Sequence, residues 1–171
     1  MRIIDFTGQE NIRSEGHTSK GDQPKWKQAG NWYKADHMGY EALSEIIVSR
    51  LLAWSDADDF VSYQPVRIHY NGKVVSGCSS RDFMRKGEML IPFERLHRAY
   101  EGRGLAQTLT RVDSPTARIA YTVDFVERVT NLTGVGAYLT SILELDCLTL
   151  NEDRHTNNLA VLRNEETKTF R

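Results

Sequence analysis

Near its C-terminal end the chain reads Asn151-Glu152-Asp153-Arg154-His155-Thr156-Asn157-Asn158. This polar octapeptide follows a segment with helical apolar spacing, 135–150, and precedes the β-like run Leu159–Leu162. A polar loop between two buried elements is a place where a rigid scaffold presents functional side chains. The loop is therefore the first candidate for a functional site.

The residue types in this loop favour phosphoryl transfer. Asp153 can accept the proton of an attacking hydroxyl, and Asn158, five residues later, can ligate Mg²⁺. One carboxylate with one neutral oxygen ligand suits a hard cation that also binds phosphate oxygens and water. Arg154 or His155 would fix the loop or counter developing negative charge. The alternative is a polar turn in which Asp153 caps a short helix and the asparagines adopt left-handed geometry.

Composition narrows the class of protein. The 171 residues carry 22 Lys and Arg against 23 Asp and Glu, a formal net charge of −1. This balance excludes a strongly basic nucleic-acid binder and a polybasic membrane-surface protein. No signal peptide and no long apolar run are apparent, so we expect a cytoplasmic protein. Cys78 and Cys147 lack disulfide or zinc spacing and are interpreted as small buried residues.

The N-terminal part mixes strands with one long helix. Asn31–Ala35 has the aromatic content of a strand, and Asn71-Gly72 between Val66–Tyr70 and Lys73–Val75 predicts a hairpin. The spacing over 39–55 predicts an amphipathic helix. Its apolar positions are Leu43, Ile46, Ile47, Leu51 and Trp54. The tryptophans Trp26, Trp32 and Trp54 are interpreted as packing residues.

The C-terminal part is mostly helical. After a strand at 89–91, Pro92 is expected to open a helix over 93–100, and Glu101–Gly104 breaks it as a candidate hinge. Helices are then predicted over 105–112, 117–132 and 135–150, and a terminal hairpin follows the polar loop. These elements together predict an α+β fold, with an antiparallel sheet and one long helix before the helical part.

A resemblance joins both parts. The segment Leu145–Leu159 resembles the catalytic loop of HipA-like kinases, in the protein-kinase-like superfamily. Its Asp-Arg-His-x-x-Asn core is shared with phosphoinositide lipid kinases. Asn31–Asp36 followed by Gly39–Glu45 is similar to the family's ATP-binding lysine strand and the helix after it, which favours the HipA-like branch and its uncharacterised bacterial members.

The resemblance implies a role for each matching residue. Asp153 would be the catalytic base, within a catalytic loop that also holds Arg154 and His155, and Asn158 would be a Mg²⁺ ligand. Lys34 would contact the nucleotide phosphates, and Glu45 would orient it, with Glu41 one turn earlier as its rival. Without the resemblance, Lys34 reads equally as a solvated strand lysine, and the glutamates as one exposed helix face.

A second phosphate contact is possible in the segment Ser14–Gly21. Its small and polar residues would let backbone N–H groups approach phosphate, with Gly16, Ser19 and Lys20 as the candidates. The segment matches neither the Walker pattern nor Gly-x-Gly-x-x-Gly. A plain flexible loop is the alternative.

At the level of the whole chain, the resemblance implies ATP- and Mg²⁺-dependent phosphoryl transfer to a protein hydroxyl. Residues 1–103 would form an N-lobe-like ATP-binding part, and 104–171 the start of a helical C-lobe with the catalytic loop at 151–158. The resemblance also implies a toxin role with an antitoxin-type partner. Neither direct nucleic-acid binding nor membrane binding is expected.

One expected element is missing. Kinases of this superfamily place a second metal-binding aspartate in an Asp-Phe-Gly-like turn after the catalytic loop, and no Asp follows Asn158. We therefore expect an incomplete catalytic domain rather than a degenerate relative. A nucleotide- or partner-binding module without turnover is the alternative. A hydrolytic metal site at Asp153, His155 and Asn158 is a third reading.

Overall fold

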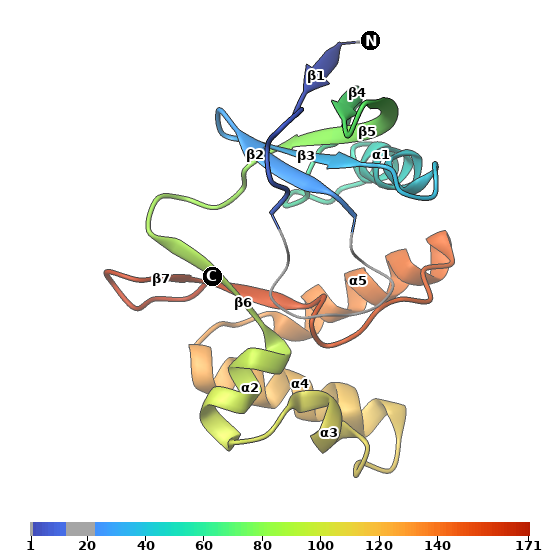
Figure 1. Ribbon diagram of the computed structural model, residues 1–171. Coiled ribbons are helices and arrows are strands. Elements are labelled where there is room, and N and C mark those ends of the chain that lie inside the picture. Colours follow the sequence, from blue (N-terminus) through green and yellow to red (C-terminus); the bar gives the residue numbers. More distant parts are fainter. Residues whose placement is uncertain (1, 13–22) are drawn as a thin grey trace. The chain divides into compact units, whose positions relative to one another are not determined.

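The computed structural model describes residues 2–12 and 23–171 (Figure 1). They form two compact units, Met1–Phe83 and Met84–Arg171. The sequence places the division later, between residues 103 and 104. The structure differs because Phe93 and Leu96 belong to the same hydrophobic core as Leu105 and Phe125, so the glycine break between them is a turn within the second unit.

The first unit is built on a curved five-stranded sheet (Figure 1). The strands lie in the order β1-β4-β5-β3-β2, and all neighbours are antiparallel except β1 and β4. Their bounds are β1 Ile3–Asp5, β2 Lys25–Gln28, β3 Asn31–Ala35, β4 Gln64–Tyr70 and β5 Lys73–Arg81. The hairpin predicted at Asn71-Gly72 is present, and both residues have positive φ, as a tight two-residue turn requires.

One face of this sheet carries an aromatic and aliphatic core. The rings of Phe6 and Trp26 stack with their centroids 4.7 Å apart, beside Ile4, Val66 and Ile68. Gly77 on β5 lets the strands approach, since a Cβ there would lie 2.5 Å from the carbonyl oxygen of Lys34. This glycine therefore helps to set the position of β3.

Helix α1, Glu41–Leu52, packs against β4 and β5 and confirms the predicted helix, although with shorter bounds. The buried positions are the small residues Ala42 and Ser49. Most of the predicted apolar face is exposed instead, with Leu43 at 57% and Trp54 at 84%. The packing interpretation of Trp54 is therefore wrong, because the helix approaches the sheet through its small side chains.

The second unit pairs β6, Glu88–Pro92, with β7, Ala160–Asn164, in antiparallel register. Pro92 ends β6 and caps the next helix, which begins at Phe93 rather than at the proline itself. The helices of this unit are α2 Phe93–Glu101, α3 Leu105–Leu109, α4 Pro115–Thr130 and α5 Val135–Thr149. Helix α4 begins at Pro115 rather than at the predicted residue 117, and the Ser114 side chain caps it by accepting the Ala117 N–H at 3.1 Å.

The last residues turn back onto β7. Leu162 and Arg171 exchange backbone hydrogen bonds of 2.8 and 2.9 Å, as a terminal hairpin requires. The Arg171 guanidinium donates to both carboxylate oxygens of Glu88, at 2.8 and 2.9 Å, and Glu88 also accepts the Arg85 N–H. These hydrogen bonds lower the pKa of Glu88 to about 2.

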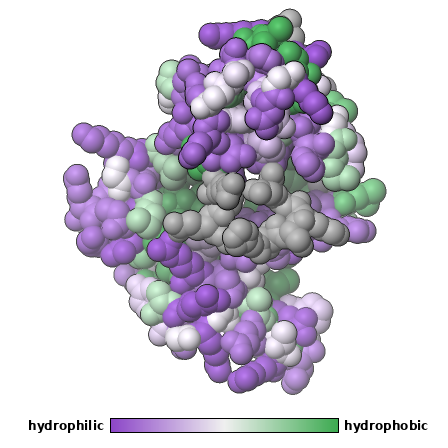
Figure 2. All heavy atoms as spheres, in the orientation of Figure 1, coloured by the Kyte–Doolittle hydropathy of each residue, from purple (hydrophilic) through white to green (hydrophobic). Residues whose placement is uncertain are grey.

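The face of the molecule drawn in Figure 2 is predominantly polar. Figure 2 shows hydrophilic residues over most of the visible face, with hydrophobic ones in small groups between them. Cys147 is exposed, contrary to the expectation of a buried thiol, whereas Cys78 is buried. None of the helices in the described residues combines the length and apolar composition needed to cross a lipid bilayer.

We expect Gly77→Ala to destabilise the first unit by roughly 1–3 kcal/mol, because the new methyl group overlaps the β3 backbone. Urea unfolding followed by tryptophan fluorescence measures this, since Trp26, Trp32 and Trp54 all lie in that unit. Gly136→Ala in α5 is the control, because its Cβ would meet only Val123 at 3.9 Å. That control, followed by circular dichroism, should be neutral or stabilising by up to about 1 kcal/mol. Equal effects of the two substitutions would contradict the account.

We expect Glu88→Gln to remove part of the pH dependence of stability. A depressed carboxylate pKa stabilises the fold above the unfolded value of 4.5, and this stabilisation is lost as the pH falls towards about 2. The variant should therefore be less stable than the parent at pH 7 and equal to it near pH 2. Urea unfolding from pH 2 to 7 measures this, with exposed Glu166→Gln as the control. A parent–variant difference that does not change with pH would contradict the assignment.

Candidate functional site

Lys34 and Glu45 meet in the first unit. Lys34 lies on β3, directly opposite Cys78 of β5, and Glu45 lies one turn into α1. The Lys34 ammonium forms an ion pair with the Glu45 carboxylate. It also donates to the Tyr63 hydroxyl at 3.1 Å, and its nitrogen lies 4.9 Å from the centroid of the Tyr63 ring. The lysine is therefore held in place on two sides.

These partners keep the Lys34 side chain protonated. Burial alone would lower its pKa, but the Glu45 carboxylate and the Tyr63 hydroxyl more than compensate and raise it above the ordinary value. The ammonium stays protonated throughout the physiological range. It forms a fixed point charge of the kind that binds phosphate.

Glu41, the rival for Lys34, has a different set of partners. Its carboxylate accepts backbone hydrogen bonds from four successive residues that precede α1, with N···O distances of 2.7–3.2 Å; these are His37, Met38, Gly39 and Tyr40. Burial opposes ionisation of Glu41, but these donors lower its pKa. Glu41 thus holds the turn before the helix and leaves Glu45 to pair with Lys34.

Tyr63 is a contact that the sequence did not reveal. It lies between α1 and β4, and its N–H donates to the Ser49 hydroxyl of the helix at 3.2 Å. No spacing pattern links residue 63 to residue 34, so only the folded chain brings them together. Burial raises the pKa of Cys78, the strand neighbour of Lys34, to about 12, which leaves this thiol protonated.

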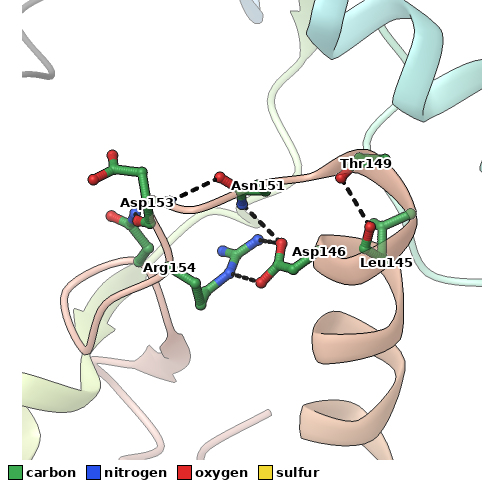
Figure 3. Close-up of polar contacts among 7 residues, drawn as sticks. Leu145, Asp146, Thr149, Asn151, Asp153 and Arg154 are labelled. Atoms are coloured by element: carbon green, nitrogen blue, oxygen red, sulfur yellow. Dashed lines mark hydrogen bonds and ion pairs between the residues drawn. The ribbon is translucent and has the colours of Figure 1, made fainter.

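The polar loop follows α5 in the second unit (Figure 3). Leu150 has a φ of 53° and ends the helix, after which the Asn151 N–H donates to the Asp146 carbonyl at 2.9 Å. Asp153 is exposed, and its N–H donates to the side-chain oxygen of Asn151 at 3.2 Å. The Asn158 amide nitrogen donates to the Asp153 carbonyl at 2.9 Å, which leaves the carboxamide oxygen as the end suited to a cation.

Arg154 and His155 stabilise the loop in different ways. The Arg154 guanidinium binds the Asp146 carboxylate through two hydrogen bonds, of 2.6 and 2.7 Å. His155 closes the turn, with its carbonyl accepting the Asn158 N–H at 2.8 Å and its Nδ1 accepting the Asn157 N–H at 3.3 Å. Of the two roles considered for Arg154, the geometry shows the one that fixes the loop.

The far end of the loop is tied to α2. The Thr156 hydroxyl donates to Glu94 at 2.9 Å, and the same carboxylate oxygen accepts the Ala106 N–H at 2.9 Å. A side chain at Gly104 would collide with this glutamate, since its Cβ would lie 1.8 Å from Glu94 Oε1. Glu94 and Asp146 are loop contacts that the sequence did not reveal, because only the folded chain shows which donors of the loop they accept.

The structure thus brings together Lys34 with Glu45 in one unit, and Asp153 with Asn158 in the other. Gly16, Ser19 and Lys20 lie outside the described residues. Within residues 2–12 and 23–171, no group of three or more His, Cys, Asp or Glu side chains is arranged to hold a metal ion.

We expect Glu45→Gln to lower the pKa of Lys34, because the Glu45 carboxylate then no longer offsets the effect of burial. Reductive ¹³C-methylation of the lysines followed by an NMR pH titration measures that pKa. Glu41→Gln is the matched control, since this glutamate bonds only to the preceding backbone in the contacts described above. A pKa of Lys34 that changes in Glu41→Gln but not in Glu45→Gln would refute the pairing.

Comparison with solved structures supports the fold. No protein-family model and no curated protein matches the sequence. The crystal structure of a Helicobacter pylori proinflammatory kinase, CtkA, is similar, with a TM-score of 0.59 and 19% sequence identity. The match covers 98% of this chain and 57% of that one, so the chain spans little more than half of the kinase's length. The described chain therefore has a kinase-like fold.

Proposed function

We propose that this chain carries the ATP-binding part and the catalytic loop of a HipA-like Ser/Thr kinase, an enzyme of ATP- and Mg²⁺-dependent phosphoryl transfer to a protein hydroxyl. The Lys34–Glu45 ion pair is the observation that carries the proposal, because protein kinases need a strand lysine paired with a helix glutamate. The similarity to a protein described as a kinase supports it.

In the first unit, Lys34 would bind the nucleotide phosphates as a point charge. Glu45 and Tyr63 would hold the ammonium where it is, so that little entropy is lost when phosphate binds. Gly16, Ser19 and Lys20 are proposed as further phosphate contacts on the basis of the sequence.

In the second unit, Asp153 would accept the proton of the acceptor hydroxyl, a role that suits its exposed carboxylate. Asn158 would ligate Mg²⁺ through its carboxamide oxygen, and this oxygen donor fits a hard cation. Mg²⁺, when bound, would neutralise charge on the phosphates. Arg154 and His155 would support these two residues by fixing the loop.

The wider proposals rest on the resemblance of residues 145–159. The acceptor would be a protein hydroxyl, the partner a protein of antitoxin type, and the site of action the cytoplasm. The first unit, Met1–Phe83, would act as the N-lobe-like part, and the second, Met84–Arg171, as the start of a C-lobe.

The second candidate is a nucleotide- or partner-binding module without turnover. Under this reading Lys34 and Glu45 would still bind nucleotide, and Asp153 would have no catalytic effect.

The decisive test is transfer of the γ-phosphate from labelled ATP in the presence of Mg²⁺, to the chain itself or to a generic protein substrate. We expect Asp153→Asn to reduce the rate by about 100-fold or more. Asp124→Asn on α4, whose carboxylate is 79% exposed, should leave the rate unchanged. Calorimetric titration with ATP should show weaker binding for Lys34→Ala and unchanged binding for Asp153→Asn.

Transfer that survives Asp153→Asn would refute the assigned base. ATP binding that depends on Lys34, without any transfer by the parent chain, would instead support the binding module.

A further inference from the structure

Asp146 lies in the last turns of α5, with its side chain only 9% exposed. Its carboxylate accepts three hydrogen bonds from the polar loop (Figure 3). Two come from the Arg154 guanidinium, and the third comes from the Asn151 amide nitrogen at 2.7 Å. A single buried carboxylate on the helix thus accepts hydrogen bonds from two residues of the loop.

The two partners of Asp146 stand on either side of Asp153. Asn151 receives the Asp153 N–H on its side-chain oxygen while its amide nitrogen binds Asp146. Arg154 is the next residue along the chain and binds the same carboxylate. The backbone of Asp153 is therefore held from both directions, while its carboxylate remains exposed.

Only a carboxylate satisfies all three donors. An ionised aspartate is purely an acceptor, whereas an asparagine at this position would offer one oxygen and turn an NH₂ group towards the guanidinium. The hydrogen bonds from Arg154 and Asn151 outweigh burial and lower the pKa of Asp146. The group is therefore ionised at neutral pH and matches the planar guanidinium fork.

We propose that Asp146 is a positioning residue that acts through Asn151 and Arg154 to aim the carboxylate of Asp153 at the acceptor hydroxyl. This inference rests on the proposed function, which makes Asp153 the base. Asp146 itself touches neither nucleotide nor acceptor, and its effect is confined to the geometry of the loop.

The test compares Asp146→Asn with the control Asp124→Asn in the full chain, with two measurements. The first is the steady-state kinetics of phosphoryl transfer. We expect kcat to fall by about 100-fold for Asp146→Asn, with KM for ATP unchanged, because misplacement of a catalytic group affects the chemical step. The second is amide hydrogen exchange, which should accelerate over residues 151–158 and remain unchanged in α4.

Arg154→Lys is a second variant, which keeps the charge but cannot form the two-bond pair. It should lose less kcat than Asp146→Asn. The double variant should be no worse than Asp146→Asn alone, because both substitutions break the same contact. If Asp146→Asn fails to fold, Arg154→Lys alone tests the proposal. A reduced kcat and faster amide exchange in the loop would then support it.

Parent-like kcat in both variants would overturn the inference, as would unchanged exchange over the loop or a loss confined to KM. If the parent chain transfers no phosphate, the proposed kinase function fails. The exchange measurement then still decides whether Asp146 orders the backbone of Asp153.

Discussion

The hydrogen-bonded ion pair between Asp146 and Arg154 is the constraint on which the candidate catalytic loop depends. A carboxylate that is almost fully buried is costly to desolvate unless it is paired, and removal of one partner leaves the other uncompensated. Here the partners come from the end of a helix and from the loop that follows it. The helix therefore has to end at Leu150, in a left-handed conformation, so that Asn151 and Arg154 can return to Asp146.

The same physical logic operates in the first unit. Lys34 is held by Glu45 and Tyr63, and the strand that carries it is brought close to β5 by the absence of a side chain at Gly77. In each unit a buried or half-buried charge pair thus holds a group suited to phosphate chemistry. In the first the pair contains the proposed phosphate ligand, and in the second it supports the proposed base.

Much of the architecture follows from local signals. Asn71-Gly72 predicted its hairpin because few other dipeptides tolerate positive φ at both positions. The helix predicted over 117–132 is present as α4, although it begins at Pro115. Apolar periodicity found α1 but not its orientation, since Ala42 and Ser49 face the sheet and Trp54 faces solvent. The sequence placed the boundary between the two units too far along the chain for a related reason. A glycine break looks the same in sequence whether it joins two helices of one core or separates two units.

The sequence by itself determined the kinds of chemistry available: an Asp and an Asn five residues apart in a polar loop, and a strand lysine followed by two helix glutamates one turn apart. It favoured Glu45 as the partner of that lysine and left Glu41 as a rival. Only the tertiary structure decided between them, because the choice depends on the rotation of α1 about its axis. Burial of Ala42 and Ser49 sets that rotation, which turns Glu45 to Lys34 and leaves Glu41 on the preceding turn. Contacts of this kind join residues with no shared local pattern, so packing selects them and spacing does not.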